Sequence, residues 1–500
     1  MNDVTSRDTE PRRRLGWIDP YVRHHHATST ADRNGTWVFA HDLLEQVARR
    51  SDGYAVFHFE DGQHRTTTGI PSTVRRRSAA DLPAEILRHD YLFCHQHLAF
   101  GGLGRLRAST GARLSICACV TTVDLSLDVY LDTLLFGHAF DAIVISSVAG
   151  RTTVETLLAD VTDSLAARGF GRRRQAGDGP AIHTIPIGID TQALIPRDRR
   201  HSRQLLRVPD DAIVLVYVGR LTWDDKADLS VLIRLVSRLR QDGIDVHLLV
   251  AGQDCDNIWA DRLRTAAATA GVGTACTIVP NFPPYLKTYI YSAGDVCVSP
   301  SDNIQETFGI ALLEAMSCGL PVVASDWSGY RDIVSHGQTG LLIPTHWCQP
   351  HVADVSRRAA WQSKAVTRRA LSQATSVDFE AFMAATRQLL LDEQCRRRMG
   401  EAGRSRAIAH FDWNVIVPKF EEVWRWQWEQ LASGQRAEPT RIDLARAFAH
   451  FPTRARLECA NGGRGHQEVA SPLASDCAVT AEKRGTDPVP DIGPLPPPQR

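Results

Sequence analysis

Short runs of hydrophobic residues alternate with longer segments in which apolar residues recur every three or four positions, and this order occurs twice along the chain. The strand-like runs of the first half are residues 55–59, 90–95, 114–121, 140–147 and 183–189. Those of the second half are residues 212–218, 246–251, 277–279, 296–299, 321–325 and 340–344. Helical spacing occurs in residues 37–50, 229–241, 310–318, 381–391 and 412–431. Strands that alternate with helices predict an α/β fold with two doubly wound parallel sheets.

Breaks in this pattern divide the chain. Residues 196–204 are polar and begin with proline, which is typical of a linker. We therefore expect a first domain in residues 1–196 and a second in residues 205–415, followed by a helical segment at residues 416–432. Residues 433–500 end in the proline-rich sequence PVPDIGPLPPPQR, and we expect this tail to be largely disordered because it cannot bury a core.

Composition and charge narrow the class of protein. Hydrophobic residues make up 43% and charged residues 23% of the chain, as in ordinary globular domains. The formal net charge is zero, which gives no reason to expect nucleic acid as a partner. Residues 1–14 are polar and the apolar runs are far shorter than a membrane span, so we expect a cytoplasmic protein without a signal peptide.

The cysteines and the arginine clusters add two further expectations. The 11 cysteines lack the spacing of a disulfide framework, so we expect reduced thiols and no structural metal, with Cys117 and Cys119 buried on a strand. The histidine run at residues 24–26 is interpreted as a surface loop. Arginine clusters are expected on solvated loop or helix surfaces, although a basic face toward anionic lipid, and so peripheral membrane contact, is an alternative; they are residues 12–14, 75–77, 172–174 and 396–398.

The strongest chemical pattern is the segment at residues 299–334. Glu306 precedes a predicted helix at residues 310–318, and Glu314 lies within that helix. A loop that leads into a helix N-terminus favours phosphate, and Gly309 lets the backbone approach a ligand closely. Carboxylates beside such a loop suit the hydroxyls of a sugar or a ribose, so the segment predicts a nucleotide-sugar pocket. The alternative is a capping carboxylate and a surface glutamate.

Other candidate residues follow predicted strands. Arg220 directly follows the strand at residues 212–218, and Lys226 lies six positions later, so the two cations are expected to neutralise a diphosphate without a metal. A surface arginine and a salt-bridged lysine are the alternative. In the first half, His95 ends a strand and is a candidate to bind a sugar hydroxyl, with His97 less favoured. The Asn34-Gly35 turn is a candidate acceptor contact.

These residues together resemble the family-4 retaining glycosyltransferases, which have the GT-B fold. The similar segments are ETFGIALLEAMSCGLPVVAS with its Glu-x7-Glu spacing, VYVGRL, IPIGID and HFDWNVIVPKFEEVW. The resemblance implies two Rossmann-like domains that face each other across a cleft. It also implies that the helix at residues 416–432 crosses back onto the first domain.

The resemblance also implies roles for individual residues. Glu306 would bind the hydroxyls of the donor sugar and Glu314 the ribose, while Arg220 and Lys226 would hold the diphosphate. His95 would lie near the donor sugar. The expected donor-binding set is Arg220, Lys226, Glu306, Thr307, Phe308, Gly309, Ile310 and Glu314, and the expected catalytic set is Glu306, His95, Arg220 and Lys226.

The implied activity is transfer of a sugar, with retention of anomeric configuration, from a nucleoside diphosphate sugar to a glycan, lipid or small-molecule acceptor. No Asp-x-Asp motif follows a strand, so no metal and no further cofactor are expected. Three alternatives remain: a sugar phosphorylase, a nucleotide-sugar epimerase, and a non-catalytic nucleotide-sugar-binding homologue. A dinucleotide-binding protein is disfavoured because no Gly-x-Gly-x-x-Gly follows a strand.

Overall fold

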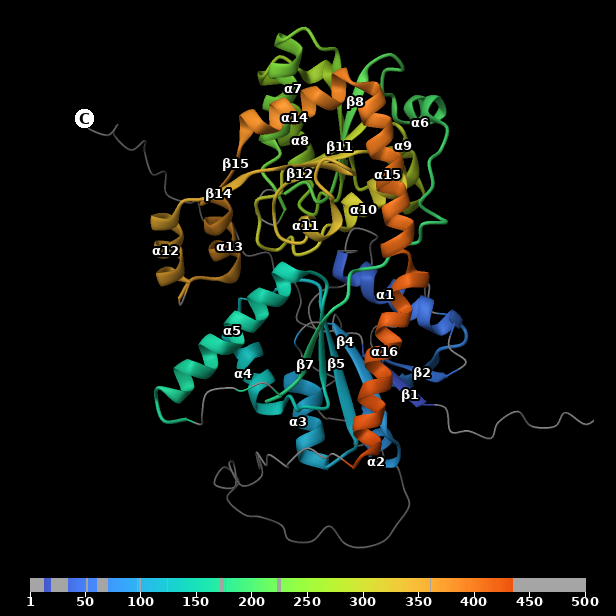
Figure 1. Ribbon diagram of the computed structural model, residues 1–500, viewed down its shortest axis with the longest axis vertical. Helices are drawn as coiled ribbons and strands as arrows, with labels where there is room; N and C mark the ends of the chain where they lie inside the picture. Colours follow the sequence, from blue (N-terminus) through green and yellow to red (C-terminus); the bar gives the residue numbers. More distant parts are fainter. Residues whose placement is uncertain are drawn as a thin grey trace, which may run out of the picture. The chain divides into compact units, whose positions relative to one another are not determined.

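The computed structural model places two parallel sheets in the chain (Figure 1). It describes residues 13–18, 35–50, 53–60, 71–96, 98, 100–123, 125–170, 175, 177–222, 226–359 and 361–434. The first sheet has seven strands in the order β3-β2-β1-β4-β5-β6-β7, and all of its pairs are parallel. Its strands are β1 (Arg13–Ile18), β2 (Tyr54–Glu60), β3 (Arg75–Ser78), β4 (Tyr91–Gln96), β5 (Leu114–Val120), β6 (Ala142–Ile145) and β7 (Ala181–Thr184).

Helices cover both faces of the first sheet because its strands are apolar on both sides. The helices of this region are α1 (Gly35–Arg50), α2 (Leu82–Arg88), α3 (Phe100–Thr110), α4 (Leu127–Phe136) and α5 (Val148–Ala166). On β4, Leu92 and Cys94 share a core with α1, whereas Tyr91 and Phe93 share another with α2 to α5. The alternation of adjacent residues between two cores is the doubly wound arrangement predicted from the sequence.

The second sheet has six strands in the order β10-β9-β8-β11-β12-β13, again all parallel. They are β8 (Ile213–Val218), β9 (Val246–Gly252), β10 (Cys276–Pro280), β11 (Val296–Ser299), β12 (Val322–Ser325) and β13 (Gly340–Ile343). The helices that precede or accompany it are α6 (Arg199–Leu206), α7 (Ser230–Gln241), α8 (Trp259–Thr269), α9 (Lys287–Ser292), α10 (Ile310–Ser317) and α11 (Tyr330–Ile333). The expected linker therefore contains α6, which Asp198 caps by accepting a hydrogen bond from the His201 N–H.

A small subdomain follows β13. Its strands β14 (Thr345–Trp347) and β15 (Thr375–Val377) pair antiparallel and enclose α12 (Gln349–Arg358) and α13 (Lys364–Gln373). The chain then continues through α14 (Phe379–Leu391) and α15 (Glu393–Phe411) to α16 (Trp413–Ala432).

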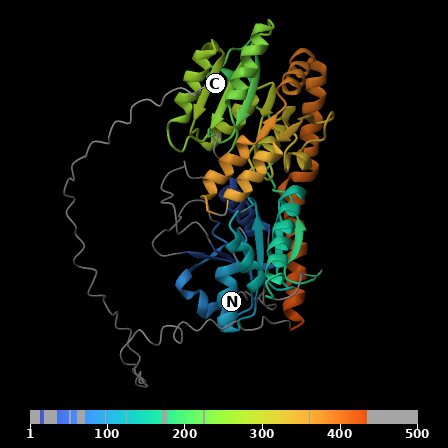
Figure 2. The same cartoon turned by 90° about the vertical axis from the view of Figure 1, so that its left-hand side faces the viewer.

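Helix α16 returns to the first sheet, as the resemblance implied. It runs beside this sheet in two perpendicular views (Figures 1 and 2) and contacts α1, β4 and β5. The Gln427 amide donates to Ser115 Oγ at 2.7 Å and to the Ile116 carbonyl at 3.0 Å. Together with the two sheets, this crossing helix confirms the predicted fold class.

Several arginines lie in places that differ from the sequence interpretation. Residues 75–77 form the edge strand β3 instead of a loop or helix surface, and Arg75 and Arg77 lie over the Phe57 ring at 5.5 and 5.7 Å. A guanidinium stacked on a ring keeps its charge solvated while its stem covers apolar surface, which lets basic residues protect a sheet edge. Residues 13–14 likewise begin β1.

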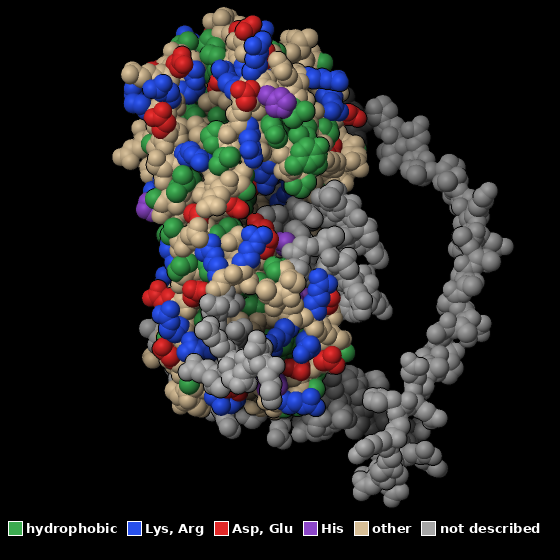
Figure 3. All heavy atoms as spheres, turned by 90° about the vertical axis from the view of Figure 1, so that its right-hand side faces the viewer, with side chains coloured by type: hydrophobic (Ala, Val, Ile, Leu, Met, Phe, Trp, Pro, Cys, Tyr) green, Lys and Arg blue, Asp and Glu red, His purple; other side chains and the backbone are tan. Residues whose placement is uncertain are grey.

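The described surface carries mixed charge. On the face drawn in Figure 3, basic and acidic side chains are interspersed, in keeping with the zero net charge. Among the described helices, none combines the length and apolar character that crossing a bilayer requires. Asn34, His97, and residues 24–26, 172–174 and 435–500 lie outside the described residues.

Candidate functional site

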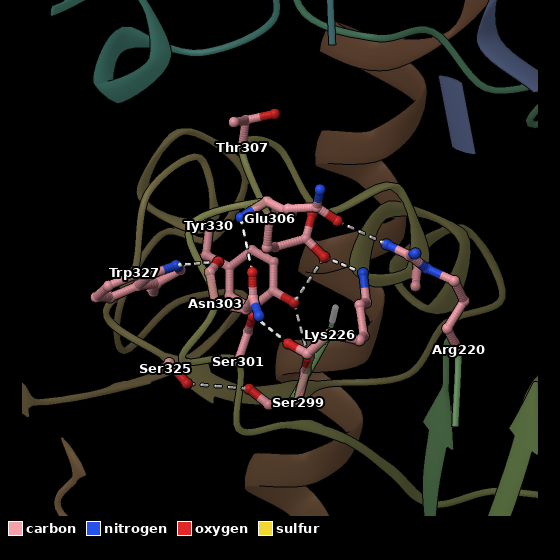
Figure 4. Close-up of polar contacts among 12 residues, drawn as sticks. Arg220, Lys226, Ser299, Ser301, Asn303, Glu306, Thr307, Ser325, Trp327 and Tyr330 are labelled. Carbon is pink, nitrogen blue, oxygen red and sulfur yellow. Dashed lines mark hydrogen bonds and ion pairs between the residues drawn. The ribbon is translucent and has the colours of Figure 1, made fainter. Parts of the chain in front are cut away.

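Glu306 lies where the sequence places it, in the loop between β11 and α10. Its side chain is 8% exposed and forms an ion pair with Lys226 through Oε2 (Figure 4). The Tyr330 hydroxyl lies 3.5 Å from the same oxygen and 2.8 Å from Ser299 Oγ. Burial raises the pKa of Tyr330 well above its usual range, so this phenol stays protonated and able to donate.

The loop around Glu306 is held by its own hydrogen bonds. The Asn303 side chain accepts from the Gln305 N–H at 3.0 Å, and its carbonyl accepts from the Trp327 indole at 3.0 Å. The Glu306 N–H donates to the same carbonyl at 3.0 Å. A carboxylate on a loop fixed in this way needs little reorganisation to bind a ligand.

Gly309 occupies the N-cap position of α10 for a steric reason. Its φ is +113°, and a Cβ built there would lie 2.5 Å from the Tyr330 ring. Gly329 packs against the same loop, since a Cβ on it would lie 2.3 Å from the Thr307 carbonyl oxygen. Glycine is therefore required at two positions where backbone and ring approach the start of α10.

Glu314 lies on α10 and is 6% exposed. Its Oε1 accepts from Lys287 Nζ at 2.7 Å and its Oε2 from the Tyr291 hydroxyl at 2.9 Å, both of which lie on α9. Burial alone would lower the pKa of Lys287, but the Glu314 carboxylate outweighs it and the pKa is raised. The expected surface-glutamate alternative does not hold, because this carboxylate is buried and doubly hydrogen-bonded.

The two predicted cations flank the loop after β8. Arg220 Nη2 lies 3.4 Å from Gln305 Oε1, next to Glu306 in the chain, and Lys226 pairs with Glu306 itself (Figure 4). Both cations are half-buried. A close approach of backbone shapes this edge of the sheet, because a Cβ on Gly252 would overlap the Gly219 carbonyl at 1.5 Å. The structure thus brings Arg220, Lys226 and Glu306 together.

The first-domain candidates are only partly placed. His95 is buried at the carboxyl end of β4, and Gly35 begins α1. One contact joins the two sheets' loops at the site: Thr307 Oγ1 donates to the Thr121 carbonyl, which follows β5. Phe308 is buried and Ile310 begins α10.

Sequence reasoning missed the residues that hold the two glutamates. Lys287 and Tyr291 lie four positions apart on α9, which places them on one face of the helix. Tyr330 and Gly329 occur within the segment at residues 299–334 but carry no spacing signal of their own. Among the described residues, two groups have metal-ligand proximity, namely Cys94, Cys117 and Cys119, and His41, Asp42 and Glu45; neither contains a predicted site residue.

Comparison with known proteins supports the class of this site. Residues 198–359 match the family described as "Glycosyl transferases group 1". The chain is 35% identical over 196 residues to a D-inositol 3-phosphate glycosyltransferase of Stackebrandtia nassauensis, which covers 36% of this chain and 43% of that protein. It is 31% identical over 212 residues to one of Streptosporangium roseum, covering 41% and 48%. The matched stretch therefore spans less than half the length of these relatives.

Solved structures resemble the whole fold at low sequence identity. Sucrose-phosphate synthase from Thermosynechococcus elongatus superposes with a TM-score of 0.58 at 18% identity, covering 84% of this chain and 100% of that one. Anabaena HepE, solved in complex with UDP, gives a TM-score of 0.58 at 17% identity, covering 83% and 99%. Sequence and fold together confirm the resemblance to family-4-type glycosyltransferases with the GT-B fold.

Proposed function

We propose that this chain transfers a glycosyl group from a nucleoside diphosphate sugar to an acceptor. The observation that carries the proposal is the buried Glu306–Lys226 pair beside the N-terminus of α10. A carboxylate, a cation and free helix-end amides at one place match the three parts of such a donor: hydroxyls, diphosphate and the bond between them. The relatives named as D-inositol 3-phosphate glycosyltransferases support the same class of reaction.

In this proposal the leaving diphosphate replaces Glu306 as the partner of Lys226. Arg220 and Lys226 neutralise the charge that builds on the diphosphate as the glycosidic bond breaks. The backbone amides of Phe308, Gly309 and Ile310 stabilise the same charge. Glu306, released from the lysine, accepts hydrogen bonds from the sugar hydroxyls.

Glu314 is proposed to bind the ribose. A carboxylate has about four acceptor positions, and Lys287 and Tyr291 use one on each oxygen. The remaining positions suit the two hydroxyls of a ribose, while the α9 contacts fix the orientation of the carboxylate. HepE, solved with UDP, supports a nucleoside diphosphate as the ligand of this fold.

Retention of anomeric configuration and independence of metal are part of the proposal. The cations at residues 220 and 226 supply charge that a metal would otherwise supply. The leaving phosphate would take the acceptor proton as the acceptor attacks from the same face of the sugar. His95, at the end of β4, would hydrogen-bond the sugar, and the Asn34-Gly35 turn would contact the acceptor.

The test is turnover of a panel of nucleotide sugars with and without acceptors, measured as release of nucleoside diphosphate. We expect release that depends on one donor and an acceptor and that Glu306→Gln abolishes. Glu401→Gln is the matched control, because Glu401 is 69% exposed on α15. Turnover that requires orthophosphate would favour a phosphorylase, and turnover without acceptor an epimerase. No turnover together with tight nucleotide binding would favour a non-catalytic homologue.

A further inference from the structure

Three cysteines meet inside the first domain, away from the proposed donor site. Cys94 on β4 is the register partner of Cys117 on β5, and Cys119 lies two residues further on the same face. The three sulfur atoms lie within 4.8 Å of one another, with Cys94 Sγ and Cys119 Sγ at 3.5 Å. The side chains are at most 2% exposed.

The surroundings of these thiols are apolar. They belong to the core that β4 and β5 share with α16, which contributes Trp424. Burial raises the pKa of the Cys94 thiol well above its ordinary value, as expected where a thiolate would lack solvent. Among the described residues, no further Cys, His, Asp or Glu joins the group within 4.8 Å.

Charge and coordination number decide what this group can bind. A divalent ion with three thiolates leaves one negative charge in an apolar core, which is costly to bury. Zinc also prefers four ligands, and the group offers three. A trivalent centre bonded to three sulfurs is neutral and complete. We propose that Cys94, Cys117 and Cys119 form a binding site for a trivalent thiophilic centre, with arsenic(III) as the probe.

The binding step balances without an oxidant. Arsenous acid carries three hydroxyl groups on As(III), and each thiol exchanges its proton for an arsenic–sulfur bond. Three S–H and three As–O bonds break, three As–S bonds and three water molecules form, and arsenic keeps its oxidation state. The product has no charge and no polar hydrogen, which suits the core beneath α16.

Two physical consequences follow. The bound centre cross-links β4 and β5, so it adds to the free energy of unfolding of the first domain. Because the thiols are buried, uptake requires a local opening of the core and is slow compared with reaction at exposed thiols. The exposed Cys255 and Cys348 provide the comparison within the same chain.

The experiment uses the full chain, incubated with arsenite and examined by native mass spectrometry. We expect one arsenic per chain with the loss of three hydrogens, a raised melting temperature, and protection of three thiols that peptide mapping assigns to Cys94, Cys117 and Cys119. Cys94→Ala and Cys119→Ala, tested separately and checked by circular dichroism, should each abolish uptake. The Cys255→Ser/Cys348→Ser variant should retain it.

Three results would overturn the proposal. They are no arsenic on the folded wild-type chain, uptake that survives both alanine variants, and stoichiometric uptake of zinc with arsenite excluded. Peptide mapping on the wild type keeps the test decisive even where a variant fails to fold. The proposal does not depend on glycosyl transfer, since none of the three cysteines touches the donor loop residues described above.

Discussion

At the scale of single residues, the same arrangement occurs twice. Glu306 is paired with Lys226 and approached by Tyr330, and Glu314 is paired with Lys287 and bonded by Tyr291. In each case a lysine balances the buried charge and a phenol fills a further acceptor position. A buried carboxylate without such partners would be costly, so the lysines allow both glutamates to be ionised in a water-poor site.

Glu306→Gln tests the first of these carboxylates. The amide keeps the size of the side chain but loses the charge that pairs with Lys226 and strengthens hydrogen bonds to hydroxyls. We expect kcat/KM for glycosyl transfer to fall by about 10²-fold or more, with the melting temperature little changed. Steady-state kinetics checks this against Glu401→Gln, and an unchanged rate in Glu306→Gln would remove this residue from the mechanism.

Asp302 predicts a pH dependence of stability. Burial raises its pKa to about 7, although a hydrogen bond from Ser372 at 2.9 Å opposes the shift. In the unfolded chain this carboxyl ionises near pH 4, so the folded state binds its proton more tightly and loses relative stability as the pH rises from about 4 to about 7. Asp302→Asn cannot ionise and should be more stable than wild type by a few degrees above pH 7, with the difference shrinking toward pH 4. Melting curves across this range check the sign, and parallel curves for the two proteins would contradict it.

At the scale of elements, the start of α10 depends on backbone geometry. Gly309→Ala places a Cβ in a left-handed conformation and against the Tyr330 ring, so we expect a loss of roughly 1–3 kcal/mol of stability and weaker nucleotide binding. Gly337→Ala is the matched control, because Gly337 has φ of +78° but open space around its Cα. Calorimetry on both variants measures the difference, and equal nucleotide affinity in both would show that the loop tolerates the change.

The start of α16 depends on Asp412. Its carboxylate accepts from the Asn414 N–H at 2.8 Å and from Thr191, tying the IPIGID segment to the crossing helix. Burial alone would raise the pKa of Asp412, but these hydrogen bonds outweigh it and the pKa is lowered. The stabilisation is therefore present above pH 4 and is lost as the pH falls through the lowered pKa.

Asp412→Ala should accordingly cost about 1–2 kcal/mol at neutral pH, and the difference from wild type should narrow in acid. Chemical denaturation at the two pH values measures it. Asp412→Asn retains an acceptor oxygen and should lose less. A cost that stays constant into acid would mean that the carboxylate charge contributes nothing.

The sequence predicted the second sheet more completely than the first for reasons visible in particular strands. Strand β8 (IVLVYV) is a continuous apolar run, as expected of a strand buried on both faces. Strands β1 and β3 begin with or consist of arginines, so their pattern is that of a polar segment. Helices α12 and α13 lie in a subdomain whose strands β14 and β15 have only three residues each, too short to show alternation.

At the scale of the whole molecule, the site is predictable where one loop carries it and hidden where the fold assembles it. Glu306, Gly309 and Glu314 lie within nine residues of one another and give a readable spacing. Lys287 reaches Glu314 and Thr121 reaches Thr307 only because the fold brings distant segments together. Helix α16 has the same character, since its contacts with Ser115 and Ile116 join residues more than 300 positions apart.

The central claim is that this assembled site binds a nucleoside diphosphate through Glu314 and the start of α10. The most direct measurement is a thermal-shift panel with UDP, GDP, ADP, CDP and dTDP on wild type, Glu314→Gln and the Glu401→Gln control. A ligand at about one hundred times its Kd adds roughly 2.7 kcal/mol, which corresponds to a rise in Tm of roughly 4 °C or more for a domain of this size. We predict such a rise with one of the five nucleotides, retained in the control and lost in Glu314→Gln. No rise with any nucleotide, or an equal rise in Glu314→Gln, would contradict the proposed site.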